Sequence, residues 1–286
     1  MNIKYLFFHN INPVFFSIGS IKIYWYGVMY VISFLFTLYI SKCIAYRTKI
    51  LKKKEIDSLF NIGFIGLLIG GRLGHVIFYD NDYFYKNYWS ILKIWEGGMS
   101  FHGALIGIII SLFYFSKKYN KKFFAITDFI APLAPYGIAN GRIGNFINGE
   151  LWGKVTNHTP FAVLFPQSHN ADLIFIKSHP IFQNIMNKWH SLPRHPSQLY
   201  EFFFEGIILL LILNLLKKIK TPYGFISSCF LIFYGIFRII MEYFRDPDYI
   251  IYFNSLEITA GQMLSLPMII LGFCILIKIF CLKNKK

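Results

Sequence analysis

Residues 123–153 read FFAITDFIAPLAPYGIANGRIGNFINGELWG, and this stretch decides the fold because an apolar run passes directly into a polar segment. The apolar part is close to the length that crosses a lipid bilayer. The polar segment, Gly141 to Gly153, begins with an arginine and also contains asparagines and a glutamate. The free-energy cost of placing an arginine at membrane depth is roughly 2.5 to 3.5 kcal/mol or more. We therefore expect Arg142 to have a buried partner or an anionic ligand.

The composition is that of a membrane protein. Of the 286 residues, 55% are hydrophobic and only 15% are charged, whereas an ordinary soluble domain has about 25% charged residues. Seven apolar runs approach the roughly 20 residues that span a hydrocarbon core. These runs are Ile23 to Ile40, Leu59 to Tyr79, Met99 to Phe115, Phe123 to Ala139, Leu199 to Leu216, Tyr223 to Met241 and Gln262 to Leu282. The sequence predicts an all-α integral membrane protein with seven transmembrane helices.

The net charge of +15 is concentrated in short turns that follow the first, third and fifth runs, and at the C-terminus. Basic residues in alternate loops indicate the cytoplasmic side of a membrane protein. The distribution predicts an N-out, C-in topology. It argues against nucleic-acid binding, because every basic cluster is short and adjoins a membrane segment.

The longest non-membrane stretch lies between the fourth and fifth runs and contains several prolines and histidines. We expect residues 1–22 to form a retained arm on the outer face and residues 23–141 to form the first four helices. Residues 142–198 are then an outer-face insertion, and residues 199–286 hold the last three helices and a cytoplasmic tail. Long loops in a compact fold are usually functional or disordered.

The four cysteines fall inside or near the cytoplasmic ends of predicted helices, so no disulfide framework is expected. No Cys/His ligand spacing is present, which argues against a metal site. We expect no metal and no cofactor. If the chemistry uses a thiol, that thiol comes from the substrate.

Polar residues on different predicted helices share one depth. In the predicted topology, Tyr26 begins the first helix, His102 begins the third, Arg142 ends the fourth, and Arg238 and Glu242 occupy the outer part of the sixth. Residues placed for separate structural reasons need not agree in depth. We expect a common functional site at the level of the outer leaflet.

Tyr234, Arg238 and Glu242 are spaced i, i+4 and i+8, which aligns them on one helix face. An ion pair within this helix would explain Arg238 and Glu242, but it would not explain Arg142. Two arginines at one depth suit a phosphate, because each planar guanidinium can hold two of its oxygens. His102 is either a base or a hydrogen-bonding residue at the start of its helix.

Two further polar segments have open interpretations. Arg72 either belongs to a deeper polar layer or is neutralised by a carboxylate such as Glu96 or Glu201. The segment Arg194 to Glu201 is the start of the fifth helix, with capping chemistry before its first turn. Alternatively, residues such as His195 and Gln198 line the site.

Four segments together resemble the bacterial prolipoprotein diacylglyceryl transferase family. They are Gly141 to Gly153, which is the most specific, Phe101 to Gly107, Arg194 to Glu201, and Tyr234 to Pro247, and they occur in the order expected for that family. The resemblance covers about Tyr24 to Pro267. The stretch from Gln167 to Trp189 does not match.

The resemblance implies transfer of a diacylglyceryl group from phosphatidylglycerol to the lipobox cysteine of a preprolipoprotein, which forms a thioether and releases glycerol phosphate. It implies a multi-pass protein of the bacterial inner membrane whose active site faces the outer leaflet. Arg142 and Arg238 match the phosphate-binding arginines of the family, and His102 matches its proposed base. The other matching site residues are Tyr26, Asn145, Glu150, Tyr234 and Glu242.

Two other functions are compatible with buried arginines in a membrane. An anion transporter would require inverted repeats, paired broken helices and a site near the midplane, and the sequence has no visible repeat. Another phospholipid-dependent membrane transferase is the closer alternative, because it would share the phosphate chemistry.

Overall fold

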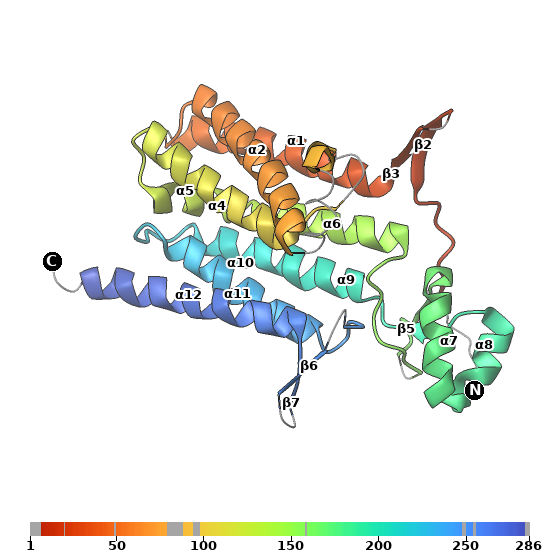
Figure 1. Ribbon diagram of the computed structural model, residues 1–286. Coiled ribbons are helices and arrows are strands. Elements are labelled where there is room, and N and C mark those ends of the chain that lie inside the picture. Colours follow the sequence, from red (N-terminus) through yellow and green to blue (C-terminus); the bar gives the residue numbers. More distant parts are fainter. Residues whose placement is uncertain are drawn as a thin grey trace. The chain divides into compact units, whose positions relative to one another are not determined.

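The computed structural model describes residues 7–19, 21–48, 50–78, 88–93, 98–157, 159–247, 250–253 and 256–283. These described residues fall into two compact units, one within the bounds Met1–Leu35 and Ile130–Lys286 and one within the bounds Phe36–Phe129. The described part of the chain is mostly helical (Figure 1). Four helical segments are long and apolar enough to cross a membrane: Trp25–Tyr46, Lys53–Ile77, Ser197–Leu216 and Ala260–Cys281. Phe225–Met241 is a shorter apolar helix, so an all-α membrane protein is confirmed at this level.

The smaller unit is built on close contact between two helix backbones. It contains the C-terminal part of α1 (Trp25–Thr48), α2 (Lys53–Phe78), η1 (Tyr88–Leu92), α4 (Phe101–Lys118) and α5 (Phe123–Ile130). Gly66, Gly70 and Gly74 recur every fourth residue on α2 and face Gly103 and Gly107 of α4. A Cβ atom added at Gly70 would lie 2.3 Å from the carbonyl oxygen of Gly103. The small residues therefore allow the approach that packs helices in lipid.

The larger unit contains the remaining helices that concern the site. They are α6 (Ala134–Asn148), α9 (Ser197–Glu201), η5 (Phe202–Ile208), α10 (Leu209–Leu216), α11 (Phe225–Met241) and α12 (Ala260–Lys283). The segments α9, η5 and α10 form one helical rod with a π-helical middle, a distortion that often marks functional sites. Helices α11 and α12 lie side by side (Figure 1).

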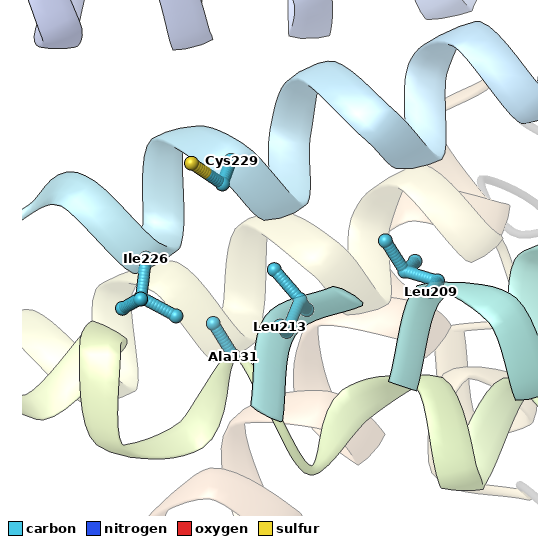
Figure 2. Close-up of a cluster of buried hydrophobic side chains, with 5 residues drawn as sticks. All are labelled: Ala131, Leu209, Leu213, Ile226 and Cys229. Atoms are coloured by element: carbon cyan, nitrogen blue, oxygen red, sulfur yellow. The ribbon is translucent and has the colours of Figure 1, made fainter. Parts of the chain in front are cut away.

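A small apolar cluster holds these helices together at one end. Figure 2 shows Ala131, Leu209 and Leu213 facing Ile226 and Cys229 of α11. All five residues are buried. Their burial fixes α10 against α11 and against the turn that precedes α6.

The fourth apolar run differs from the single helix that was predicted. It forms α5 and then α6, with a turn at residues 131–133 between them. Pro135 lies in the first turn of α6, where the missing N–H of proline is tolerated. A proline cannot donate to a carbonyl of the preceding turn, so the run breaks before it. Arg142 consequently belongs to α6, a separate helix of 15 residues.

The segment between α6 and α9 has its own small fold. It contains β4 (Val163–Leu164), η3 (Pro166–Ser168), α7 (His169–Ser178), η4 (Pro180–Phe182), α8 (Gln183–Trp189) and β5 (Pro193–Arg194). Strand β4 is central in a three-stranded sheet with β1 (Phe7–Phe8) and β5. Its pairing with β1 joins the N-terminal arm to this segment.

Two hairpins complete the larger unit. Strand β2 (Val14–Ile18) pairs with β3 (Ile21–Tyr24), and β6 (Ile250–Phe253) pairs with β7 (Leu256–Thr259). The arm presents four phenylalanines, each at least 42% exposed: Phe7, Phe8, Phe15 and Phe16. Exposed aromatic side chains in this number are typical of a surface that contacts a membrane or another protein.

Candidate active site

The polar segment Gly141 to Gly153 forms the last turns of α6 and the chain that leaves it. Gly149 ends the helix in the left-handed conformation, with φ 66°, which glycine adopts without a Cβ penalty. The backbone N–H of Glu150 then donates to the carbonyl of Asn145 at 3.1 Å. This cap turns the chain sharply, so Glu150 stays close to the last turn of α6, the helix that carries Arg142.

Arg142 reaches two carboxylates on the neighbouring rod. Its Nη1 lies 3.1 Å from Glu201 Oε2, and its Nη2 donates to Glu205 Oε2 at 2.9 Å. The side chains of Glu201 and Glu205 are both fully buried. The expectation that Arg142 has a buried partner is confirmed. The partners are two glutamates, one of which, Glu205, the sequence analysis did not single out.

Arg238 completes the connection from α11. Its Nη1 donates to Glu201 Oε1 at 2.5 Å, and its Nη2 lies 2.6 Å from Glu242 Oε1. The ion pair within the helix, considered from the i, i+4 spacing, is therefore present. It does not act alone, because Glu201 bridges Arg238 to Arg142. The two arginines predicted to share a site are brought together by a carboxylate.

A third arginine joins the cluster, which also leaves polar atoms unpaired. Arg245 Nη1 lies 3.6 Å from Glu201 Oε1. Arg142 Nε and Glu205 Oε1 are buried and make no hydrogen bond within the described residues. Unsatisfied buried polar atoms are uncommon and call for a ligand, a water or a functional role.

Glu205 and Arg245 were missed by the sequence analysis. Glu205 lies in the fifth apolar run, four residues after Glu201, so both project from one face of the rod. A carboxylate inside an apolar run is unfavourable at membrane depth for the same reason as an arginine, and it marks a functional site in the same way. That signal was available in the sequence.

Tyr26 packs against α6 beside Arg142. A Cβ atom added at Gly144 would lie 3.0 Å from the Tyr26 ring, so the glycine makes room for the tyrosine. The Tyr26 hydroxyl is 2.9 Å from the hydroxyl of Tyr30. Tyr26 and Arg142 belong to the same unit and interact electrostatically.

Asn145 and Glu150 form a second polar group on α6. Asn145 Nδ2 donates to Glu150 Oε1 at 2.9 Å, and Gln198 Nε2 donates to the backbone carbonyl of Glu150 at 2.7 Å. Gln198 therefore contacts this group, as the interpretation of residues 194–201 as site lining requires. The same residues also start α9, but the expected capping chemistry was wrong, because no side chain caps this helix and Ser197 Oγ donates to the carbonyl of Leu151. A role of this segment in lining the site stays a prediction.

Tyr234 lies one turn before Arg238 on α11, and its ring stacks on Phe230 with the ring planes 10° apart. It interacts electrostatically with Glu205 and with both arginines. The alignment of Tyr234, Arg238 and Glu242 on one face, predicted from their spacing, is thus directed at the cluster.

The His102 side chain lies outside the described residues, although its backbone is part of α4. Its role stays a prediction. Arg72 donates to backbone carbonyls of Ser90, Ile91 and Gly98. Glu96, one of the two partners considered for it, also lies outside the described residues, and Glu201 pairs with the arginines of the larger unit.

A second buried ion pair supports the chain that leaves the site. Arg194 on β5 contacts Asp172 of α7 at 2.7 Å and Asp246 at 2.8 Å, and donates to the carbonyl of Gly153 at 2.9 Å. Asp172 belongs to the stretch Gln167 to Trp189, which the motif resemblance left unassigned. The pair connects this stretch to Gly153 at the end of the polar segment.

His195 follows Arg194 and packs its ring against Tyr200 and Phe244. Partial burial lowers the pKa of His195, and the nearby Lys154 ammonium lowers it further. The neutral form is therefore favoured.

A cavity of about 570 Å³ lies beside this region and is lined by Lys154, Arg194 and Glu242 among others. Because Glu242 belongs to the arginine cluster, this cavity lies next to the cluster and is large enough to hold solvent.

The arginines of the cluster are groups that can bind an anion. Three guanidinium groups converge, and guanidinium binds phosphate or carboxylate oxygens. Among the described residues, no group of three or more His, Cys, Asp or Glu side chains is placed to hold a metal.

Comparison with known proteins agrees with this geometry. The sequence pattern of the prolipoprotein diacylglyceryl transferase family matches residues 13–278. The chain belongs to the prolipoprotein diacylglyceryl transferase family. The match includes every candidate site residue from Tyr26 to Glu242 and extends beyond the range inferred from the motifs.

Curated relatives in this family are similar over almost their whole length. A protein of Buchnera aphidicola subsp. Acyrthosiphon pisum (strain Tuc7) is 52% identical over 275 residues, which are 96% of this chain and 98% of the relative. A protein of Wigglesworthia glossinidia brevipalpis is 50% identical over 96% of this chain and 98% of its own. One of Proteus mirabilis (strain HI4320) is 48% identical over 97% and 95%. Each is named phosphatidylglycerol–prolipoprotein diacylglyceryl transferase.

Proposed function

We propose that this protein transfers the diacylglyceryl group of phosphatidylglycerol to the lipobox cysteine of preprolipoproteins. The observation that carries the proposal is the sequence identity of 52% over 96% of the chain to a relative with this name. The products are a thioether and glycerol phosphate. The buried cluster of arginines supports the proposal, because the bond that breaks joins carbon to a phosphate oxygen.

The leaving phosphate gains negative charge as this bond breaks. Preorganised cations at that position stabilise the transition state more than the ground state. We assign this role to Arg142 and Arg238, with Asn145, Glu150, Tyr234 and Glu242 as substrate-binding residues of the same site. The support is that one carboxylate, Glu201, contacts both guanidinium groups.

The attacking cysteine must lose its proton, since the thiolate is the nucleophile. His102 is the proposed base, and Tyr26 is a proposed catalytic residue beside Arg142. Two arginines close to the incoming thiol would also lower its pKa through their field. The two effects act in the same direction, and they are separated by experiment below.

The protein is proposed to lie in the bacterial inner membrane with seven spans, its N-terminus outside and its C-terminus in the cytoplasm. Alternating basic clusters support this orientation. Residues 1–22 and 142–198 would then lie on the outer face, which directs the site toward the outer leaflet. Residues 23–141 and 199–286 would supply the spans and the cytoplasmic tail.

Incubation of the purified protein with phosphatidylglycerol and a lipobox peptide tests the function. Mass spectrometry should show a peptide that gains the mass of one diacylglyceryl group, together with free glycerol phosphate. A peptide with serine in place of the cysteine is the control and should stay unmodified. Release of glycerol phosphate or fatty acid without peptide modification would indicate a lipase and contradict the proposal.

A further inference from the structure

Among the described residues, the buried charges that form ion pairs around Arg142 and Arg238 cancel. The cluster contains Arg142, Arg238 and Arg245 on one side and Glu201, Glu205 and Glu242 on the other. The three carboxylate side chains are 0%, 0% and 3% exposed. Three positive and three negative groups give a sum of zero.

A lipid phosphodiester carries one negative charge into this neutral cluster. A buried charge without a compensating charge is strongly unfavourable. Either a carboxylate must move into water or one carboxylate must take up a proton. Glu201 and Glu205 project from a buried face of the rod and are fully covered, so uptake of a proton requires the smaller rearrangement.

The contacts distinguish the three carboxylates. Glu201 lies within 3.6 Å of all three arginines, and Glu242 holds Arg238 at 2.6 Å. Glu201 Oε2 makes no hydrogen bond either, but it lies 3.1 Å from Arg142 Nη1. Glu205 has a single close contact, at 2.9 Å to Arg142, and its Oε1 makes no hydrogen bond and lies 3.8 Å from Arg238. Its free oxygen can accept a proton without breaking an existing bond.

The charged and titratable groups around Glu205 come from three elements. They are Arg142 on α6, Glu201 on the same rod, and Tyr234 and Arg238 on α11. A proton on Glu205 reduces the repulsion from Glu201. It also frees the Arg142 Nη2 that Glu205 now occupies, beside the unpaired Arg142 Nε.

We propose that binding of the lipid phosphodiester at Arg142 is coupled to the uptake of one proton by Glu205. The inference rests on the proposed function, since it assigns the anion to that site. The phosphodiester brings one negative charge, and one proton from solvent converts the Glu205 carboxylate to the acid. The loaded cluster is again neutral, and the new O–H can donate to a phosphate oxygen.

Calorimetric titration with short-chain phosphatidylglycerol tests the coupling. When it is repeated in buffers of different ionisation enthalpy, it should report an uptake of about one proton per bound lipid. The affinity should fall as pH rises, by up to about tenfold per pH unit. Glu205→Gln should bind the lipid with little pH dependence and almost no proton uptake. Glu257→Gln, a matched change on β7 outside the cluster, should behave like the wild type.

Infrared difference spectra assign the proton to a residue. Lipid binding should produce the carbonyl band of a protonated carboxyl group, and Glu205→Asp should shift this band while Glu201→Asp leaves its position unchanged. Lipid binding without proton uptake, or a band that shifts only in Glu201→Asp, would overturn the inference. Either result would leave peptide modification intact, whereas failure of the proposed function would appear as wild-type protein that modifies no peptide.

Discussion

Asp172 and Arg194 form a buried ion pair in which Asp172 Oδ1 lies 2.7 Å from Arg194 Nη2, although 22 residues separate them in the chain. Asp172 also accepts from Ser168 Oγ at 2.7 Å and from the Leu192 backbone N–H at 2.8 Å. One carboxylate therefore organises α7, β5 and the turn before α7. It anchors the segment between α6 and α9 to the chain that carries Gly153.

Asp172→Asn should destabilise the protein markedly, because it leaves the buried Arg194 partly uncompensated. Removal of one partner of a buried pair typically costs about 3–5 kcal/mol. Thermal unfolding of the detergent-solubilised protein measures the effect. Asp57→Asn is the matched control, since its ion pair with Lys42 is 48% exposed on the Asp57 side and such pairs contribute about 0–1 kcal/mol. Equal losses for the two variants would contradict the anchoring role.

Gly153→Ala should lower the unfolding temperature through a steric clash. A Cβ atom at this position would lie 2.4 Å from the carbonyl oxygen of His195 and 2.6 Å from that of Phe244. Overpacking of this kind costs about 1–3 kcal/mol. Gly137→Ala is the control, because no heavy atom lies within 4 Å of its added Cβ. In a helix interior that change should be neutral or stabilising by about 0.5–1 kcal/mol.

The proposed topology places Lys52 and Lys118 in the cytoplasm and Asn170 outside. Single cysteines at these positions, in a background without the four native cysteines, can be treated with a membrane-impermeant maleimide on intact cells. Only the cysteine at position 170 should react before the cells are opened. Reaction at 52 or 118 without reaction at 170 would invert the model of the membrane orientation.

Arg142→Ala should abolish diacylglyceryl transfer while the protein still inserts into the membrane, because Arg238 continues to neutralise Glu201. Arg142→Lys should also be poor, by about 100-fold or more, since one ammonium cannot hold two carboxylates and a phosphate as the guanidinium fork does. The rate of peptide modification and the amount of protein in the membrane fraction are measured together. Near-normal turnover by the alanine variant would remove Arg142 from the site.

His102→Gln separates the two roles open to this residue. Loss of an obligatory base should lower the rate by roughly 100-fold to 10,000-fold, whereas a hydrogen-bonding role should leave much of the activity. We expect the large loss, with disappearance of the acidic limb of the pH–rate profile. A variant within about tenfold of wild type, with an unchanged acidic limb, would exclude His102 as the required base.

Much of the site was predictable, because charged residues are energetically unfavourable inside apolar segments. Arg142, Arg238 and Glu242 stand out against apolar surroundings, and the four-residue spacing on α11 predicted their shared face. Glu205 carried the same signal and was overlooked. Asp172 was not predictable, because an aspartate in an irregular segment has no periodic or compositional feature that distinguishes a buried anchor from a surface charge.

The sequence by itself determined the membrane class, the approximate helix positions and the family, because apolar length, charge distribution and motif order are properties of local stretches. Only the tertiary structure decided which groups neutralise one another. Arg142 and Glu205 are 63 residues apart, and any of several carboxylates could have compensated the arginine at similar energy. The packing of α6 and α11 against the rod of α9, η5 and α10 selects Glu201 and Glu205, because burial leaves these carboxylates as the charges within reach of both guanidinium groups.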